Sequence, residues 1–145
     1  MESQIANRLA AFLVFWCIIT PPTSRVLGEL QQQAFRITPN DVEARQGEEV
    51  VLRCEIEHLA GRVQWTKDGF ALGFSNEIIG YPRFSLNQNH STGVFNLRIT
   101  NASMEDAASY QCQAGPAKHN RPIRAGAKLT VLGSLKAHRS MLHWN

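Results

Sequence analysis

The stretch DAASYQC at residues 106–112 places a tyrosine two positions before a cysteine and alternates small or apolar residues with polar ones. Such alternation is typical of a β-strand with one buried face. Upstream, a second cysteine, Cys54, lies in another alternating run, and Trp65 follows it by 11 residues. These four residues, in the order cysteine, tryptophan, tyrosine and cysteine, are therefore the reference positions from which the remaining strands are assigned.

Short alternating runs recur between turn signals from residue 35 to residue 132, and no segment of useful length has helical periodicity. Asp68-Gly69 is a hairpin-type turn, because this pair tolerates positive φ. A loop is expected from Gly115 to Gly126, before the last strand. Many short strands separated by turns predict an all-β sandwich. The expected strands are 35–38, 50–56, 63–66, 70–72, 83–86, 95–99, 109–114 and 128–132.

The spacing of the two cysteines, the tryptophan and the tyrosine predicts an immunoglobulin-like β-sandwich of the V/I-set type over residues 35–132, with one disulfide between the sheets. In that fold a buried tryptophan packs on the disulfide, and a tyrosine hydroxyl fastens the corner before the second cysteine. Strand alternation turns these residues inward together with apolar neighbours. The core residues that we expect are Trp65, Leu97 and Tyr110.

The first 28 residues have the composition of a secretory signal peptide. Arg8 precedes an apolar block from Leu9 to Ile19, and polar residues follow it. The block is shorter than the about 20 residues that span a bilayer, although an uncleaved signal anchor is an alternative. Cleavage is expected after Gly28, with Ser24 as a rival site. Residues 29–34 are then a flexible lead-in, and the mature chain as written has no membrane-spanning segment.

Two links are expected to hold the sandwich together. Cys17 leaves with the signal peptide, so Cys54 and Cys112 remain and should pair in an oxidising compartment. On the chain-entropy model this bond stabilises the domain by roughly 4 kcal/mol, out of a total of about 5–15 kcal/mol. Arg83, at a strand start, is expected to form a partly buried ion pair with Asp106.

Several stretches resemble the first immunoglobulin domain of the irregular chiasm and kin-of-irre (nephrin-like) adhesion receptors. The most specific lies within VQWTKDGFALG at residues 63–73, because Gln64, Thr66 and Lys67 are not required by an immunoglobulin core. The resemblance covers about residues 34–132. Its other stretches are YPRF at 81–84, NLRIT at 96–100, ASYQCQA at 108–114 and AKLTVL at 127–132.

The resemblance implies a role at the plasma membrane, where such receptors meet at cell–cell junctions. They bind themselves or nephrin-like receptors through the outer face of the sheet that contains strands C, F and G. A soluble secreted antagonist or an immune-type recognition protein is the alternative. Residues 133–145 are unlike the family and are expected to be an unstructured tail, as in a secreted isoform or a truncated receptor.

Alternation also predicts which side chains lie on that outer face. Because Trp65, Tyr110 and Cys112 point inward, their neighbours on the same strands point outward. A glutamine both donates and accepts hydrogen bonds, so it can meet its own copy across a two-fold axis, where a lysine or glutamate would meet a like charge. The expected partner-binding residues are Gln64, Thr66, Gln111, Gln113, Lys128 and Thr130.

The remaining signals concern modification and the classes of function that the sequence disfavours. Asn89-His90-Ser91 and Asn101-Ala102-Ser103 are N-glycosylation sequons. The five histidines show no metal-ligand spacing, and no nucleophile elbow or phosphate loop is present, so we expect no enzyme, metal or cofactor. Without residues 1–28 the net charge falls from +3 to +2, which is too weak to indicate a nucleic-acid partner. The basic residues Lys118, Arg121, Arg124 and Lys128 are interpreted as a solvated loop.

Overall fold

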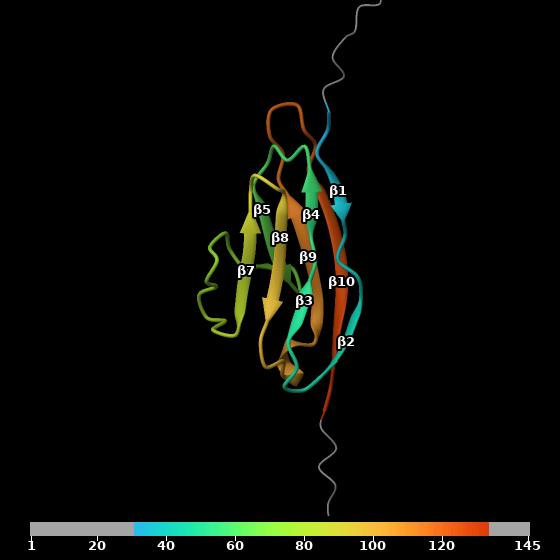
Figure 1. The fold of residues 1–145 in the computed structure, drawn as a ribbon, viewed down its shortest axis with the longest axis vertical. Coiled ribbons are helices and arrows are strands. Elements are labelled where there is room, and N and C mark those ends of the chain that lie inside the picture. Colours follow the sequence, from blue (N-terminus) through green and yellow to red (C-terminus); the bar gives the residue numbers. More distant parts are fainter. Residues whose placement is uncertain (1–30, 134–145) are drawn as a thin grey trace, which may run out of the picture. The chain divides into compact units, whose positions relative to one another are not determined.

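Two β-sheets lie face to face in the computed structural model, which describes residues 31–133. One of them, the β8 sheet, lies nearer the viewer in Figure 1. It contains β1 (Ala34–Ile37), β3 (Val50–Leu52), β4 (Glu55–Glu57), β7 (Phe84–Asn89) and β8 (Val94–Ile99). The other, the β9 sheet, contains in order β2 (Val42–Arg45), β10 (Ile123–Leu132), β9 (Ala108–Ala114), β5 (Val63–Lys67) and β6 (Phe70–Ala71).

This arrangement confirms the predicted all-β sandwich. Strands β5, β9 and β10 take the places of strands C, F and G, and a 3-10 turn, η1 (Met104–Asp106), precedes β9. No helix among residues 31–133 is long and apolar enough to cross a membrane. The predicted signal peptide and residues 134–145 of the predicted tail lie outside the described residues.

Near Pro39 the N-terminal segment passes from one sheet to the other. Strand β1 pairs with β4 in the β8 sheet, whereas β2 runs parallel to β10 in the β9 sheet. Proline cannot donate to a ladder, which explains why the first strand ends before it. The sequence prediction stopped there and missed β2, although residues 42–45 alternate.

The last strand is longer than predicted. Strand β10 begins at Ile123, so the expected loop from Gly115 to Gly126 is wrong over residues 123–126. Arg124 pairs with Gln113 and Gly126 with Gln111, both on β9. This non-local pairing extends a segment whose own sequence has a weak strand signal.

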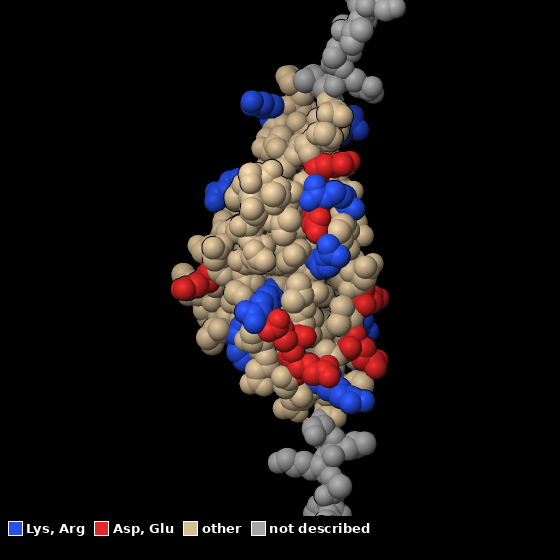
Figure 2. All heavy atoms as spheres, in the orientation of Figure 1, with Lys and Arg blue, Asp and Glu red and all other residues tan. Residues whose placement is uncertain are grey.

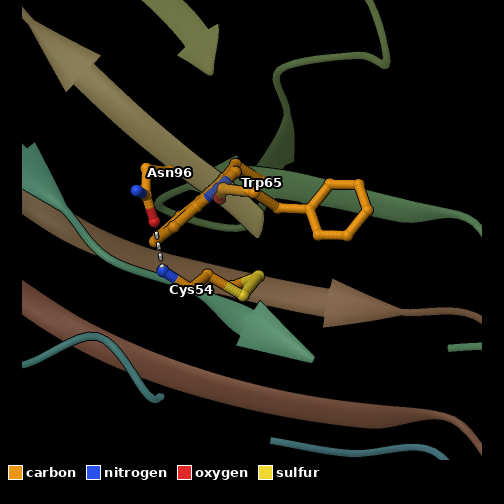
Figure 3. Close-up of a disulfide and its surroundings, with 5 residues drawn as sticks. Cys54, Trp65 and Asn96 are labelled. Carbon is orange, nitrogen blue, oxygen red and sulfur yellow. Dashed lines mark hydrogen bonds between the residues drawn. A yellow bond between two sulfur atoms is a disulfide. The ribbon is translucent and has the colours of Figure 1, made fainter. Parts of the chain in front are cut away.

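The predicted disulfide links the sheets at the centre of the core. Cys54 and Cys112 are joined with an S–S distance of 2.05 Å and a Cα–Cα distance of 6.5 Å. Trp65 packs beside it, and its Nε1 donates to the carbonyl oxygen of Phe95 at 2.7 Å. Figure 3 shows the second contact in this group, where the Cys54 N–H donates to Asn96 Oδ1 at 3.0 Å. Trp65 and Leu97 are buried, as predicted.

The corner before β9 contains the predicted tyrosine contact and ion pair. The Tyr110 hydroxyl donates to the carbonyl oxygen of Asp106 at 2.7 Å. Arg83 Nη2 donates to Asp106 Oδ1 at 2.8 Å, and Nη1 reaches Oδ2 as well. Burial alone raises the pKa of the Asp106 carboxyl, but hydrogen bonds from Arg83 and from the Ser103 N–H outweigh it and lower that pKa below its usual value. Burial raises the pKa of Tyr110.

Gln32 and Gln33, which belong to the predicted flexible lead-in, are hydrogen-bonded to the domain just before β1. Gln33 is 3% exposed. Its Nε2 donates to the carbonyl oxygens of Gly115 and Arg121, at 2.9 and 2.7 Å. Its Oε1 accepts from the N–H groups of Ala60 and Gly61, at 3.3 and 3.1 Å. The amide thus fills both donor and both acceptor positions.

These contacts fix the β9–β10 loop, residues 115–122. The Gln33 N–H donates to Asn120 Oδ1 at 2.6 Å, and Gln32 Nε2 donates to the His119 carbonyl oxygen at 3.1 Å. A Cβ added to Gly61 would lie 1.9 Å from the Gly115 carbonyl oxygen, so the two loops touch through backbone alone. Residues 32 and 33 therefore act as a strap across the loops at this end of the domain.

The first prediction concerns the pH dependence of the Arg83–Asp106 pair. Because the folded-state pKa of Asp106 lies below the ordinary value of about 3.9, the ionised pair stabilises the fold above that pH. The stabilisation is lost as pH falls through the folded-state pKa. Asp106→Asn should lower the free energy of unfolding by about 3 kcal/mol at pH 7 and by much less near pH 2, measured by urea denaturation.

The control for this prediction is Glu57→Gln, which removes a carboxylate from an exposed residue outside every ion pair of residues 31–133. It should leave stability nearly unchanged at all pH values. A stability difference between wild type and Asp106→Asn that stays constant from pH 7 to pH 2 would contradict the ionic role.

The second prediction concerns the strap. Gln33→Leu keeps a similar volume but leaves four backbone groups without their partner, so it should lower the free energy of unfolding by roughly 1–3 kcal/mol. Hydrogen exchange at the Ala60 and Gly61 amides should accelerate. Gln31→Leu is the matched control, because Gln31 is exposed and its side chain makes no hydrogen bond within residues 31–133. Equal melting and equal exchange in both variants would refute the strap.

Candidate partner-binding face

The outer face of the β9 sheet is built from β5, β9 and β10 lying side by side. Tyr110 and Cys112 point into the core, so the alternate residues of β9 point outward. Register then groups the outward residues of the three strands into rows across the sheet. The first row is Gln64, Gln113 and Arg124, and the second is Thr66, Gln111 and Gly126.

Three neighbouring amides dominate this face. Gln64, Gln111 and Gln113 are each partly buried, yet none of their side chains makes a hydrogen bond within residues 31–133. Gln88, in the β8 sheet, behaves differently, since its Nε2 donates to Phe74 O at 2.9 Å and to Asn76 Oδ1 at 2.7 Å. The three amides thus keep their donors and acceptors for water or a partner.

Thr66 corrects one part of the predicted face. It lies in the expected row but is only 4% exposed, so it is not a freely accessible contact residue. It forms the floor of a shallow hollow of about 330 Å³. Gly69 and Gly126 also line this hollow and have no side chains to fill it. The prediction that Thr66 is exposed was wrong because it considered the alternation along one strand and not the neighbouring strands of the sheet.

The other two predicted residues lie toward the β2 edge of the face. Lys128 is exposed, and its backbone N–H donates to Asp41 Oδ1 at 2.7 Å. Thr130 is partly buried and pairs with Glu43 on β2. Sequence reasoning missed Arg124 and Gly126 as members of the central rows, because both were placed in a loop.

The opposite face, on the β8 sheet, has a different chemistry. Arg36 and Arg53 both bind Glu55, at 2.9 and 2.7 Å, and Arg98 binds Glu49. Hydrogen bonds from Arg53 and then from Arg36 lower the pKa of Glu55. Figure 2 shows this side, where positive and negative side chains lie interleaved. Its charges are thus largely neutralised within the face.

The two sequons lie away from the outer face of the β9 sheet, which we call the amide face after Gln64, Gln111 and Gln113. Asn89 ends β7, and its Oδ1 accepts from the N–H groups of Ser91 and Thr92, at 3.0 and 3.2 Å. Its Nδ2 makes no hydrogen bond within residues 31–133. Asn101 is exposed between β8 and η1, with a φ of 50°. Both side chains thus have room for a glycan that leaves the β9 sheet uncovered.

The chemistry of the face suits binding. Its rows contain amides, a hydroxyl and one cation, and they bring no acid and base together around a nucleophile. Within the part of the chain that the structure describes, no three histidine, cysteine, aspartate or glutamate residues gather closely enough to hold a metal ion.

The comparisons with known proteins agree with the fold and with the sequence resemblance. The Immunoglobulin V-set domain model matches residues 37–132. Kin of IRRE-like protein 1 of Homo sapiens is 41% identical over 102 residues, which is 70% of this chain and 13% of that protein. Irregular chiasm C-roughest protein of Drosophila melanogaster is 38% identical over 104 residues, 70% of this chain and 14% of that protein. The chain thus spans a small part of the length of these relatives.

Two solved structures of related proteins also match this chain over its immunoglobulin domain. A crystal structure of Duf (Kirre) D1 matches with a TM-score of 0.67 at 39% identity, covering 70% of this chain and 98% of that one. A crystal structure of Rst D1-D2 matches with a TM-score of 0.68 at 37% identity, covering 71% of this chain and 50% of that one.

Proposed function

Because the chain belongs to the immunoglobulin V-set family, in the group of the irregular chiasm and kin-of-irre proteins, we propose that it works in cell–cell adhesion or recognition. It binds a second copy of itself or a nephrin-like receptor, outside the cell, through the outer face of the β9 sheet. The proposal rests on the family and on one structural observation, the three adjacent amides whose side chains make no hydrogen bond within residues 31–133.

The contrast between the two faces supports this choice of surface. On the β8 sheet, Glu55 and Glu49 already have arginine partners, so a binding partner would have to break those contacts. On the β9 sheet, the side chains of Gln64, Gln111 and Gln113 have no hydrogen bond to break among the described residues, 31–133. Two copies related by a two-fold axis can pair such amides without bringing like charges together.

The expected interaction is weak for a single pair of domains. One face of this size buries about 1,200–1,600 Å² in a complex, and such interfaces range widely in affinity. We expect micromolar binding, which many copies on two membranes strengthen through avidity.

The third prediction tests the face. The full chain, displayed on cells through a neutral membrane anchor, should make them cluster with themselves or with cells that bear a nephrin-like receptor. Gln64→Asp should abolish clustering, because the added carboxylate meets its own copy or a desolvated partner. The melting temperature should stay nearly unchanged, since the Gln64 side chain makes no hydrogen bond within residues 31–133.

Asn87→Asp is the matched control. It makes the same change from amide to carboxylate on an exposed residue of β7, on the opposite sheet. It should cluster like wild type. If Gln64→Asp and Asn87→Asp cluster equally well, the outer face of the β9 sheet is not the binding surface.

The fourth prediction concerns the sequons, which we propose carry N-linked glycans. Enzymatic removal of N-glycans from the secreted protein should increase its mobility on a denaturing gel. Asn89→Gln and Asn101→Gln should each remove one part of that shift and leave clustering intact, because both residues lie off the amide face. A variant with unchanged mobility would show that its sequon is unused.

A further inference from the structure

Basic side chains gather at the end of the domain that carries the β9–β10 loop, at the top of Figure 1. Lys118 and Arg121 belong to that loop and are exposed. Arg124 is exposed on β10, just after the loop. Arg62 is exposed before β5, and its carbonyl oxygen accepts from the Gly115 N–H at 2.9 Å. Four cations thus surround this end, which we call the cationic end.

The charge of the cationic end is not neutralised within residues 31–133. The ion pairs of these residues use other arginines. No aspartate or glutamate occurs from residue 107 to residue 133, and Glu57, at the end of β4, forms no ion pair with these cations. Lys128, which the sequence grouped with them, lies apart, with its N–H bonded to Asp41.

The β9–β10 loop is held in a fixed shape. The Asn120 N–H donates to the Ala117 carbonyl oxygen at 2.8 Å, which closes a tight turn with Lys118 near its tip. The strap then bonds to residues 119–121 through their backbone and the Asn120 amide. The side chains of Lys118 and Arg121 make no hydrogen bond within residues 31–133. The loop therefore presents its cations without a large ordering cost on binding.

A fixed group of unpaired cations favours a ligand with several anionic groups. An arginine can donate two parallel N–H bonds to one oxyanion, and a lysine acts as a point charge. Arg62 and Arg124 lie on the two sides of β9, so their strands are about 10 Å apart, two strand spacings. The loop continues the basic surface beyond them. One linear polyanion can thus contact all four cations and release its counterions.

The composition of the loop distinguishes between classes of polyanion. Proteins that bind single-stranded nucleic acids stack bases on aromatic side chains, and residues 115–122 contain no phenylalanine, tyrosine or tryptophan. Segments that bind a membrane surface insert large apolar side chains beside their cations. The same residues contain no large aliphatic side chain, and Ile123 is partly buried. A sulfated polysaccharide needs neither of these features.

We infer that the cationic end binds a sulfated glycosaminoglycan, a linear polysaccharide that carries sulfate and carboxylate groups on successive sugars. The inference goes beyond the proposed function, because it adds a carbohydrate partner to the protein partner. Binding is electrostatic, so it weakens as salt rises.

The test measures the binding of heparin oligosaccharides to the secreted full chain across a series of salt concentrations. The cationic-end variant carries K118Q, R121Q and R124Q. Its Kd at low salt should rise about tenfold or more, and the slope of log Kd against log salt concentration should fall by about three, one for each lost contact. The melting temperature should stay near that of wild type, because the strap bonds the backbone of Arg121 and not its side chain.

Two controls show whether position or net charge decides binding. The variant R45Q/R53Q/R98Q removes the same charge from three exposed residues elsewhere on the domain and should bind heparin nearly as tightly as wild type. The variant K136Q/R139Q tests the cations that follow the described residues and should bind likewise. Equal weakening in R45Q/R53Q/R98Q and the cationic-end variant would overturn the inference, as would a loss confined to K136Q/R139Q.

The choice of probe tests the class of ligand. Desulfated heparin should bind much more weakly than heparin, since it lacks most of the anionic groups. Tighter binding to single-stranded RNA or to phosphatidylserine vesicles than to heparin would show that the ligand class is wrong. The assay uses soluble protein, so its result does not depend on cell clustering. If cells that display wild type cluster but the soluble chain does not bind heparin at low salt, the inference fails and the proposed function stands.

Discussion

The contact between Trp65 and the Cys54–Cys112 bond is the constraint on which the rest of the structure depends. The bond joins the two sheets, and the indole fills the space beside it while donating to Phe95 across the sandwich. With Trp65 and Cys112 fixed as partners in the ladder, β5 and β9 have one possible register. That register brings Gln64 beside Gln113, so the outer face is a consequence of the core.

Much of this was predictable because it depends on alternation along a single strand. The inward positions of Trp65, Tyr110 and Leu97 follow from the period of two, and the disulfide, the tyrosine corner and the Arg83–Asp106 pair follow from the fold that the spacing indicates. The start of β10 at Ile123 did not follow, because residues 123–126 are held by non-local pairing with β9 and include Gly126. The burial of Thr66 was missed for the same reason.

The burial of Gln33 could not be predicted from the sequence, for a different reason. It belongs to a run of three glutamines that reads as a solvated leader, and nothing local separates it from Gln31 or Gln32. Only the folded arrangement brings four backbone groups of two distant loops to its amide. A buried amide that fills all its hydrogen bonds is stable, but the same residue one position earlier in the chain would have been exposed.

Folding and the proposed binding depend on alternate residues of the same strands. On β9, Tyr110 and Cys112 hold the core and the corner. Gln111 and Gln113 face outward, and their side chains make no hydrogen bond in the part of the chain that the structure describes. An outward amide that water can reach costs little stability, so nothing in the fold requires an amide there. On the β8 sheet, the outward carboxylates Glu55 and Glu49 are paired with arginines of the same face. Within residues 31–133, Gln64, Gln111 and Gln113 can exchange water for a partner without breaking an internal side-chain hydrogen bond, which is why we assign binding to the β9 sheet.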